Sequence, residues 1–167
     1  MKVNLIVAVD KNYGIGLDNK LPWKFSQDML YFKNHTKGAG DNAIIMGKNT
    51  YLSIKKTLPC RDNIILSTSL DSKTLEKSAF VCKNITELEN FISTKTYDDI
   101  WVIGGSSIYK QFLEMPECIN KIFITEIDNE YNCDTFFPRI PSVFLLDKSF
   151  VTYENDVLLK FSVYKKT

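Results

Sequence analysis

The chain has 167 residues, a length typical of one folded domain with a sizeable buried core. Its hydrophobic content of 44% and charged content of 25% are those of a globular protein, and a net charge of +1 gives no electrostatic preference for nucleic acid or an anionic membrane. No apolar run is longer than a strand, so we expect no membrane partner, and the first run lacks the length and cleavage site of a signal peptide.

The cysteines and the single histidine do not favour a metal site. The cysteines at positions 60, 82, 118 and 133 form no CxxC pair, and zinc ligands would have to be gathered from scattered positions. Without a secretion signal, we expect reduced thiols and a cytoplasmic protein.

Short apolar runs rich in β-branched residues predict strands at residues 3–9, 43–47, 63–68, 79–82, 100–105, 121–127 and 157–165. Helical patterns lie between them, at residues 28–34, 48–54, 86–93 and 106–115. The last segment, residues 150–166, reads as a hairpin that turns at residues 154–156. The alternation predicts an α/β fold in which residues 1–167 form a single domain, with a mainly parallel central sheet, flanking helices and a C-terminal antiparallel hairpin.

The start of the first helix raises a question about one acid. Ser26 is the expected N-cap, and Asp28 follows in the first turn on the same face as Phe32. A carboxylate is favoured there by the helix dipole, so this segment alone favours a solvated capping role for Asp28 over a functional one. Thr86 and Glu89 have the spacing of a capping box for a later helix.

Two strand-to-helix junctions have the form of an anion site. Residues 44–50 pass through Gly47 into a helix, and residues 101–109 do the same through Gly104 and Gly105. Glycine allows close approach to the free N–H groups of a helix start, which suits the two phosphates of a dinucleotide. Neither GxGxxG nor GxxxxGK[ST] occurs, so any nucleotide site has another design.

Positive charge for a further phosphate could come from Lys48 or Lys83, each of which is more simply solvated surface. The glycine-containing segment 13–20 is either a plain surface loop or a mobile flap over a site.

In this order and spacing, the motifs resemble the dihydrofolate reductase family along essentially the whole chain. The resemblance rests on Asp28 with Phe32 and on IVAVDKNYGIGLDNKLPW (6–23), IIMGKNTYLSI (44–54), LPCRDNIILS (58–67), VIGGSSIY (102–109), ITEID (124–128) and DTFFP (134–138). It implies NADPH-dependent reduction of 7,8-dihydrofolate to 5,6,7,8-tetrahydrofolate, with hydride transfer to C6 and protonation at N5, in support of one-carbon metabolism and thymidylate synthesis. It also implies antifolate binding and a monomer.

The resemblance assigns catalytic roles to three residues. Asp28 is expected to hold the pterin and promote protonation, Thr125 to orient that acid, and Tyr109 to lie near the nicotinamide. Arg61 matches the arginine that forks onto the glutamate tail of the substrate. The substrate site is expected to comprise Ile6, Val7, Ala8, Asp28, Met29, Phe32, Lys33, Ile54, Leu58, Arg61 and Ile103.

The resemblance also implies an NADPH site and a cis bond between Gly104 and Gly105. The expected cofactor residues are Ala8, Gly14, Ile15, Gly16, Leu17, Asp18, Asn19, Lys20, Gly47, Lys48, Asn49, Thr50, Leu66, Ser67, Thr68, Ser69, Lys83, Gly104, Gly105, Ser106, Ser107, Ile108, Tyr109 and Gln111.

The sequence departs from the family pattern at Tyr51, Cys60 and Cys133. Two alternatives remain at this point: a pteridine or riboflavin-pathway reductase of the same fold, and a non-catalytic folate- or nucleotide-binding regulator. The set of Asp28 with Phe32 and Arg61 argues against the first, and the intact acid and Gly-Gly pair argue against the second.

Overall fold

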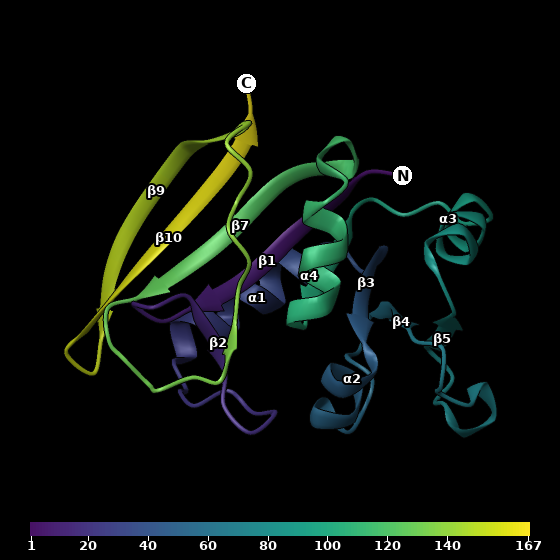
Figure 1. Ribbon diagram of the computed structural model, residues 1–167. Coiled ribbons are helices and arrows are strands. Elements are labelled where there is room, and N and C mark those ends of the chain that lie inside the picture. The colour runs from purple at the N-terminus through teal and green to yellow at the C-terminus, as the bar shows by residue number, and fades with distance from the viewer.

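The computed structural model describes residues 1–167, and Figure 1 shows a twisted central sheet with helices around it. Its strands are β1 (Val3–Val9), β2 (Gly14–Gly16), β3 (Asn42–Gly47), β4 (Arg61–Leu66), β5 (Ala79–Cys82), β6 (Ile100–Gly104), β7 (Ile119–Ile127), β8 (Thr135–Phe136), β9 (Phe144–Glu154) and β10 (Val157–Lys166). Its helices are α1 (Ser26–Lys37), α2 (Lys48–Ile54), α3 (Ile85–Ser93) and α4 (Ser106–Leu113), with 3-10 turns at Ser72–Thr74 and Pro116–Cys118. No helix is both long and apolar enough to cross a membrane.

Eight strands form the main sheet in the order β5-β4-β3-β6-β1-β7-β10-β9. The strands from β5 to β7 in this order are parallel to one another, and β10 and β9 are antiparallel additions at one edge. The expected fold class is therefore confirmed. Because β6 returns between β3 and β1, the direction of winding reverses there, and such a reversal opens a crevice at the carboxyl ends of the strands.

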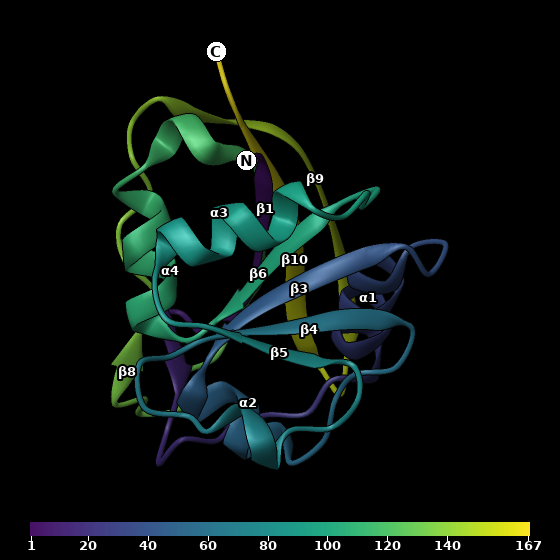
Figure 2. The ribbon, with the colours of Figure 1, turned by 90° about the vertical axis from the view of Figure 1, so that its right-hand side faces the viewer.

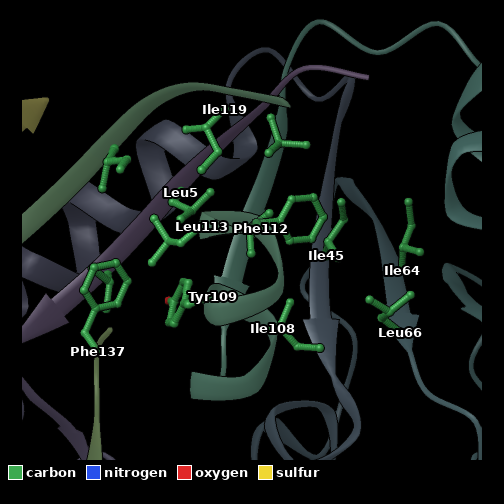
Figure 3. Packing of buried hydrophobic residues seen from close by; sticks show 14 of the residues in the cluster. Leu5, Ile45, Ile64, Leu66, Ile108, Tyr109, Phe112, Leu113, Ile119 and Phe137 are labelled. Carbon is green, nitrogen blue, oxygen red and sulfur yellow. The ribbon is translucent and has the colours of Figure 1, made fainter. Parts of the chain in front are cut away.

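Helices cover both faces of the sheet, which explains why several strands are apolar throughout. Figure 2 shows α3 and α4 on one side and α1 on the other. Leu5 of β1 and Ile45 of β3 pack toward Phe112 of α4, as Figure 3 shows, whereas Ile6 and Ile44 belong to the separate core cluster of the opposite face. This alternation is the two-residue period of a strand.

Several predicted boundaries need correction. Strand β9 begins at Phe144, six residues before the predicted hairpin, because its outward-facing side chains are exposed and give no continuous apolar run. The short strands β2 and β8, which pair with each other, were not expected. Helix α4 ends at Leu113, two residues earlier than predicted.

Both predicted helix caps are also wrong. Helix α1 has Phe25 at its N-cap with no side-chain cap bond, and Ser26 is already helical. Helix α3 begins at Ile85, with Asn84 as its cap; the Asn84 side chain accepts a hydrogen bond from the N–H of Glu87 at 2.9 Å.

Candidate active site

A cavity of about 1290 Å³ opens where the carboxyl ends of β1, β3, β4 and β6 meet α1, α2 and the segment around residues 15–21. Its lining contains one carboxylate, Asp28, and three lysines, Lys20, Lys48 and Lys83. Elsewhere the lining consists of apolar side chains, glycines, hydroxyls and amides. The cavity can thus hold a ligand that carries negative charge near the lysines and offers hydrogen-bond donors at Asp28.

Asp28 projects from the first turn of α1 into this cavity and is half-buried. Burial raises the pKa of its carboxyl group because a low-dielectric surrounding disfavours the charge. The Thr125 hydroxyl, on β7, opposes this shift by hydrogen bonding, and the nearby Glu154 carboxylate adds to it. Asp28 is therefore an acid that holds its proton more tightly than an exposed aspartate does.

Apolar side chains from β1, α1, α2, β6 and the segment after α2 line the same cavity as Asp28. The cavity brings together those that were expected to enclose a substrate, namely Ile6, Val7, Ala8, Met29, Phe32, Ile54, Leu58 and Ile103. Met29 keeps 54% of its surface exposed, so α1 presents an apolar rim as well as an apolar wall. A flat aromatic ligand fits such a slot, with its polar edge against the carboxylate.

Two expected substrate residues do not line the cavity. Lys33 is exposed on α1. Arg61 is 6% exposed, and its guanidinium donates to the Pro59 carbonyl and the Thr36 hydroxyl, each at 2.9 Å. It borders a second hollow of about 440 Å³ outside the main cavity. Its remaining N–H donors make no hydrogen bond within the chain, so the guanidinium can still bind a carboxylate.

Tyr109 is on α4, lines the cavity and forms a hydrogen bond to β1. Its hydroxyl is buried and donates to the Ile6 carbonyl at 2.7 Å, and burial raises its pKa far above the ordinary value. The peptide bond between Gly104 and Gly105 is cis, as expected. Gly104 has φ +118°, and a Cβ there would lie 3.2 Å from the Tyr109 ring, so only glycine allows the strand to approach Tyr109 this closely.

The two strand-to-helix junctions lie next to each other. A Cβ added at Gly47 would lie 3.0 Å from Ile108 on α4, and one added at Gly105 would lie 3.5 Å from the Thr50 hydroxyl on α2. The Lys48 ammonium donates to the Ser69 hydroxyl at 3.1 Å beside this pair. Backbone N–H groups, hydroxyls and a cation are the donors that phosphates and ribose require, so these residues fit a dinucleotide.

Most of the expected cofactor residues line this cavity; Gly14, Leu17 and Asp18 do not. The cavity also includes residues that the sequence prediction missed, namely Leu21, Ser53, Asn84, Ile85, Thr86 and Thr135. Residues 84–86 were missed because α3 was predicted to begin later. The cap signal of Asn84, three residues before Glu87, could have found them.

The segment beside the cavity is tied to the end of β1 and to residues 131–136. Asp10 accepts N–H bonds from Gly14 at 2.8 Å, Asn12 at 2.9 Å and Tyr131 at 3.1 Å. Further along, the Asp134 carboxylate accepts from the N–H of Asp18 at 3.1 Å. Gly14, although outside the cavity lining, is therefore part of its support.

Comparisons with known proteins agree in one result. The family model described as Dihydrofolate reductase matches residues 2–166. The dihydrofolate reductase of Drosophila melanogaster is 39% identical over 152 residues, which cover 86% of this chain and 83% of the relative. That of Aedes albopictus is 35% identical and covers 99% of this chain and 97% of the relative. The bifunctional dihydrofolate reductase-thymidylate synthase of Daucus carota is 37% identical over 96% of this chain, which spans 33% of that protein.

Proposed function

This chain belongs to the dihydrofolate reductase family, and from that premise we propose that NADPH is its hydride donor and Asp28 its catalytic acid. The protein is an oxidoreductase that binds dihydrofolate as substrate and reduces it, in folate and one-carbon metabolism. The open questions are which residues perform the reaction and which nicotinamide cofactor they select.

The observation that supports the role of Asp28 is its position as the single carboxylate in the cavity. Its two oxygens accept hydrogen bonds from the 2-amino group and N3 of the pterin, which fixes the ring between Ile6 and Phe32. Because burial raises the pKa of Asp28, the group can carry a proton at a pH where an exposed aspartate is ionised. Release of that proton to the pterin for N5 leaves Asp28 as the carboxylate that accepts from the 2-amino group and N3. Thr125 orients the carboxylate from β7.

The glutamate tail of the substrate extends toward the rim of the cavity near Leu58. Arg61, held by Pro59 and Thr36, offers the rest of its guanidinium to the α-carboxylate of that tail. The buried hydrogen bonds fix the guanidinium plane before the substrate arrives, which lowers the entropic cost of a bidentate contact.

The two junctions at Gly47 and Gly105, with Ser67–Ser69 between β4 and the 3-10 turn, would hold the phosphates and ribose of NADPH. Lys48 and Lys83 provide positive charge for the 2′-phosphate. When bound, NADPH supplies the hydride for C6 of the pterin. The protein keeps Tyr109 fixed through Ile6, so the floor beneath the nicotinamide is rigid.

We further propose that 2,4-diaminopyrimidine antifolates bind to Asp28, because their protonated ring edge presents two parallel donors to one carboxylate. We also propose that the protein is a monomer, as the resemblance of its sequence to the family implies. The four free cysteines fit a reducing compartment such as the cytoplasm.

The test is spectrophotometric measurement of NADPH oxidation with and without dihydrofolate. The Asp28→Asn variant should reduce turnover at neutral pH by about 10²–10⁴-fold, the range of a lost general acid. The loss should become smaller at lower pH, where solvent can protonate the substrate. Activity of wild-type strength in Asp28→Asn, or a loss of the same size at every pH, would refute the assignment of this acid.

A further inference from the structure

Helix α1 depends on a residue from the opposite end of the chain for its cap. Glu154 is the last residue of β9 and precedes the tight turn at Asn155 and Asp156, whose φ angles are +52° and +63°. Its carboxylate accepts hydrogen bonds from the backbone N–H of Ser26 at 2.7 Å and of Gln27 at 2.9 Å. The Ser26 hydroxyl donates to the same carboxylate at 3.2 Å.

These contacts satisfy two of the N–H groups that every helix leaves unpaired in its first turn. The N-cap residue, Phe25, makes no side-chain cap bond, so Glu154 performs that function from a separate element. The Gln27 side chain also donates to the Tyr153 carbonyl at 3.2 Å. The C-terminal hairpin is therefore fastened to the two residues that directly precede Asp28.

Glu154 also acts on Asp28 through its charge. Two groups influence the pKa of the Asp28 carboxyl besides burial: the Thr125 hydroxyl on β7 and Glu154 on the hairpin. On the same helix, burial and the charge of Asp28 itself raise the pKa of the Tyr31 phenol. The N–H donors of Gln27 and Ser26 lower the pKa of Glu154, whereas burial and the Glu154 charge raise that of Asp28. The hydrogen bonds to Glu154 thus favour its ionised form, whereas burial favours the protonated form of Asp28.

We propose that Glu154 is a positioning residue for the reaction: its carboxylate fixes the helical turn that presents Asp28 to the substrate and places a negative charge at the N–H groups of Ser26 and Gln27, next to Asp28. The proposal rests on the proposed role of Asp28 as the acid. A residue with the structural role alone would hold α1 in place without affecting the ionisation of Asp28. Glutamine removes the charge and keeps one acceptor oxygen, which can hold the Gln27 N–H and the Ser26 hydroxyl but turns its NH₂ group toward the Ser26 N–H. Alanine removes both oxygens, so the titration of Asp28, followed in both variants, distinguishes the charge from the cap.

The experiment compares Glu154→Gln and Glu154→Ala with Asp147→Asn as a matched control. Asp147 is on the same strand, pairs with Lys165 at 3.0 Å, and lies roughly 23 Å along β9 from Glu154 at about 3.3 Å per residue. The control thus removes one negative charge from the same hairpin far from α1. Thermal melting of each variant establishes that it is folded.

The first measurement is independent of catalysis. In protein labelled with ¹³C at the aspartate carboxyl, the Asp28 signal is assigned by its loss in Asp28→Asn, and its titration midpoint is followed without ligand. The midpoint should move to lower pH in Glu154→Gln and stay in place in Asp147→Asn. An unchanged midpoint in a folded Glu154→Gln protein would overturn the electrostatic part of the proposal.

The second measurement is the pH profile of dihydrofolate reduction at saturating NADPH. Glu154→Gln should lose turnover mainly at neutral and alkaline pH, with little change in KM for dihydrofolate. Glu154→Ala, which also releases the helical turn, should lose turnover at every pH and raise KM. If both Glu154 variants match Asp147→Asn in both measurements, Glu154 is only a structural cap and the proposal is overturned. If the wild-type protein does not reduce dihydrofolate but the Asp28 midpoint still shifts in Glu154→Gln, the proposed function fails and the coupling of Glu154 to Asp28 stands.

Discussion

Replacement of Asp10 by asparagine should destabilise the protein strongly, although Asp10 lies outside the cavity lining. Asp10 keeps only 2% of its surface exposed, and its carboxylate accepts hydrogen bonds from the backbone N–H groups of Asn12, Gly14 and Tyr131. One oxygen accepts from Asn12 and Gly14, and the other accepts from Tyr131. An asparagine oriented to keep the first two bonds turns its NH₂ group toward the Tyr131 N–H, so two donors face each other.

The expected cost follows from these contacts. A hydrogen bond to a charged group contributes about 1.5–3 kcal/mol, and a buried donor left unpaired costs about 1–3 kcal/mol. Since these contributions overlap, we expect a total loss of about 2–4 kcal/mol for Asp10→Asn. For a chain of this size, each kcal/mol lowers Tm by about 2–4 °C, so the decrease should be roughly 5–15 °C.

The pH dependence gives this prediction a second signature. Burial by itself would raise the pKa of Asp10, but the N–H groups of Gly14, Tyr131 and Asn12 and the Cys133 thiol together lower it. The stabilisation is therefore present above the pKa of the unfolded chain and is lost as pH falls through the folded pKa. Calorimetry should find the gap between wild type and Asp10→Asn closing in acid.

The matched control is Asp134→Asn, which removes an exposed carboxylate that accepts from the Asp18 N–H at 3.1 Å. It should change Tm far less than Asp10→Asn does. The reasoning is refuted if the two variants melt together, or if the deficit of Asp10→Asn is constant with pH.

Three further predictions concern other residues. Asp28→Asn should melt above wild type at neutral pH and lose this advantage in acid, because the raised pKa of Asp28 means that the folded state loses stability as pH rises through it; a melt below wild type at neutral pH would contradict this. Lys48→Ala should raise KM for NADPH more than for NADH, whereas an equal rise would exclude Lys48 as the reader of the 2′-phosphate. Gly14→Ala should melt lower, because its Cβ would lie 2.4 Å from that of Cys133, and Cys133→Gly in the same chain should restore part of the loss.

Much of the fold could be predicted because a strand that is buried on both faces consists of consecutive apolar residues, which can be recognised in the sequence. Strands β1, β5 and β10 begin where their apolar runs begin. The edge strand β9 could not be delimited in this way, because Leu145, Phe150 and Val151 are each more than half exposed and the polar residues 147–149 interrupt its apolar run. Strand β9 pairs with β10 through backbone hydrogen bonds, and the side-chain pattern of an edge strand predicts such pairing only weakly.

The candidate site likewise has a part that could be predicted from the sequence and a part that could not. Residues on strands and at strand ends, such as Ile6 and Gly104, do line the cavity, because the resemblance aligns them with fixed elements. The cap of α1 could not be predicted, since Ser26 has the right residue type and Glu154 is 128 positions away. A long-range hydrogen bond leaves no local pattern, so only the folded arrangement reveals it.

The contrast between Asp10 and Asp28 explains why one acid is structural and the other is available for chemistry. Backbone N–H groups already occupy both oxygens of Asp10, and together with the Cys133 thiol they lower its pKa despite its burial. No backbone N–H donates to Asp28, whose raised pKa reflects burial and a like charge, opposed only by Thr125. A ligand that offers two donors can therefore satisfy Asp28 but not Asp10. The same unsatisfied hydrogen-bonding capacity makes Asp28 destabilising to the folded protein, as expected of a group whose proposed role is in the reaction.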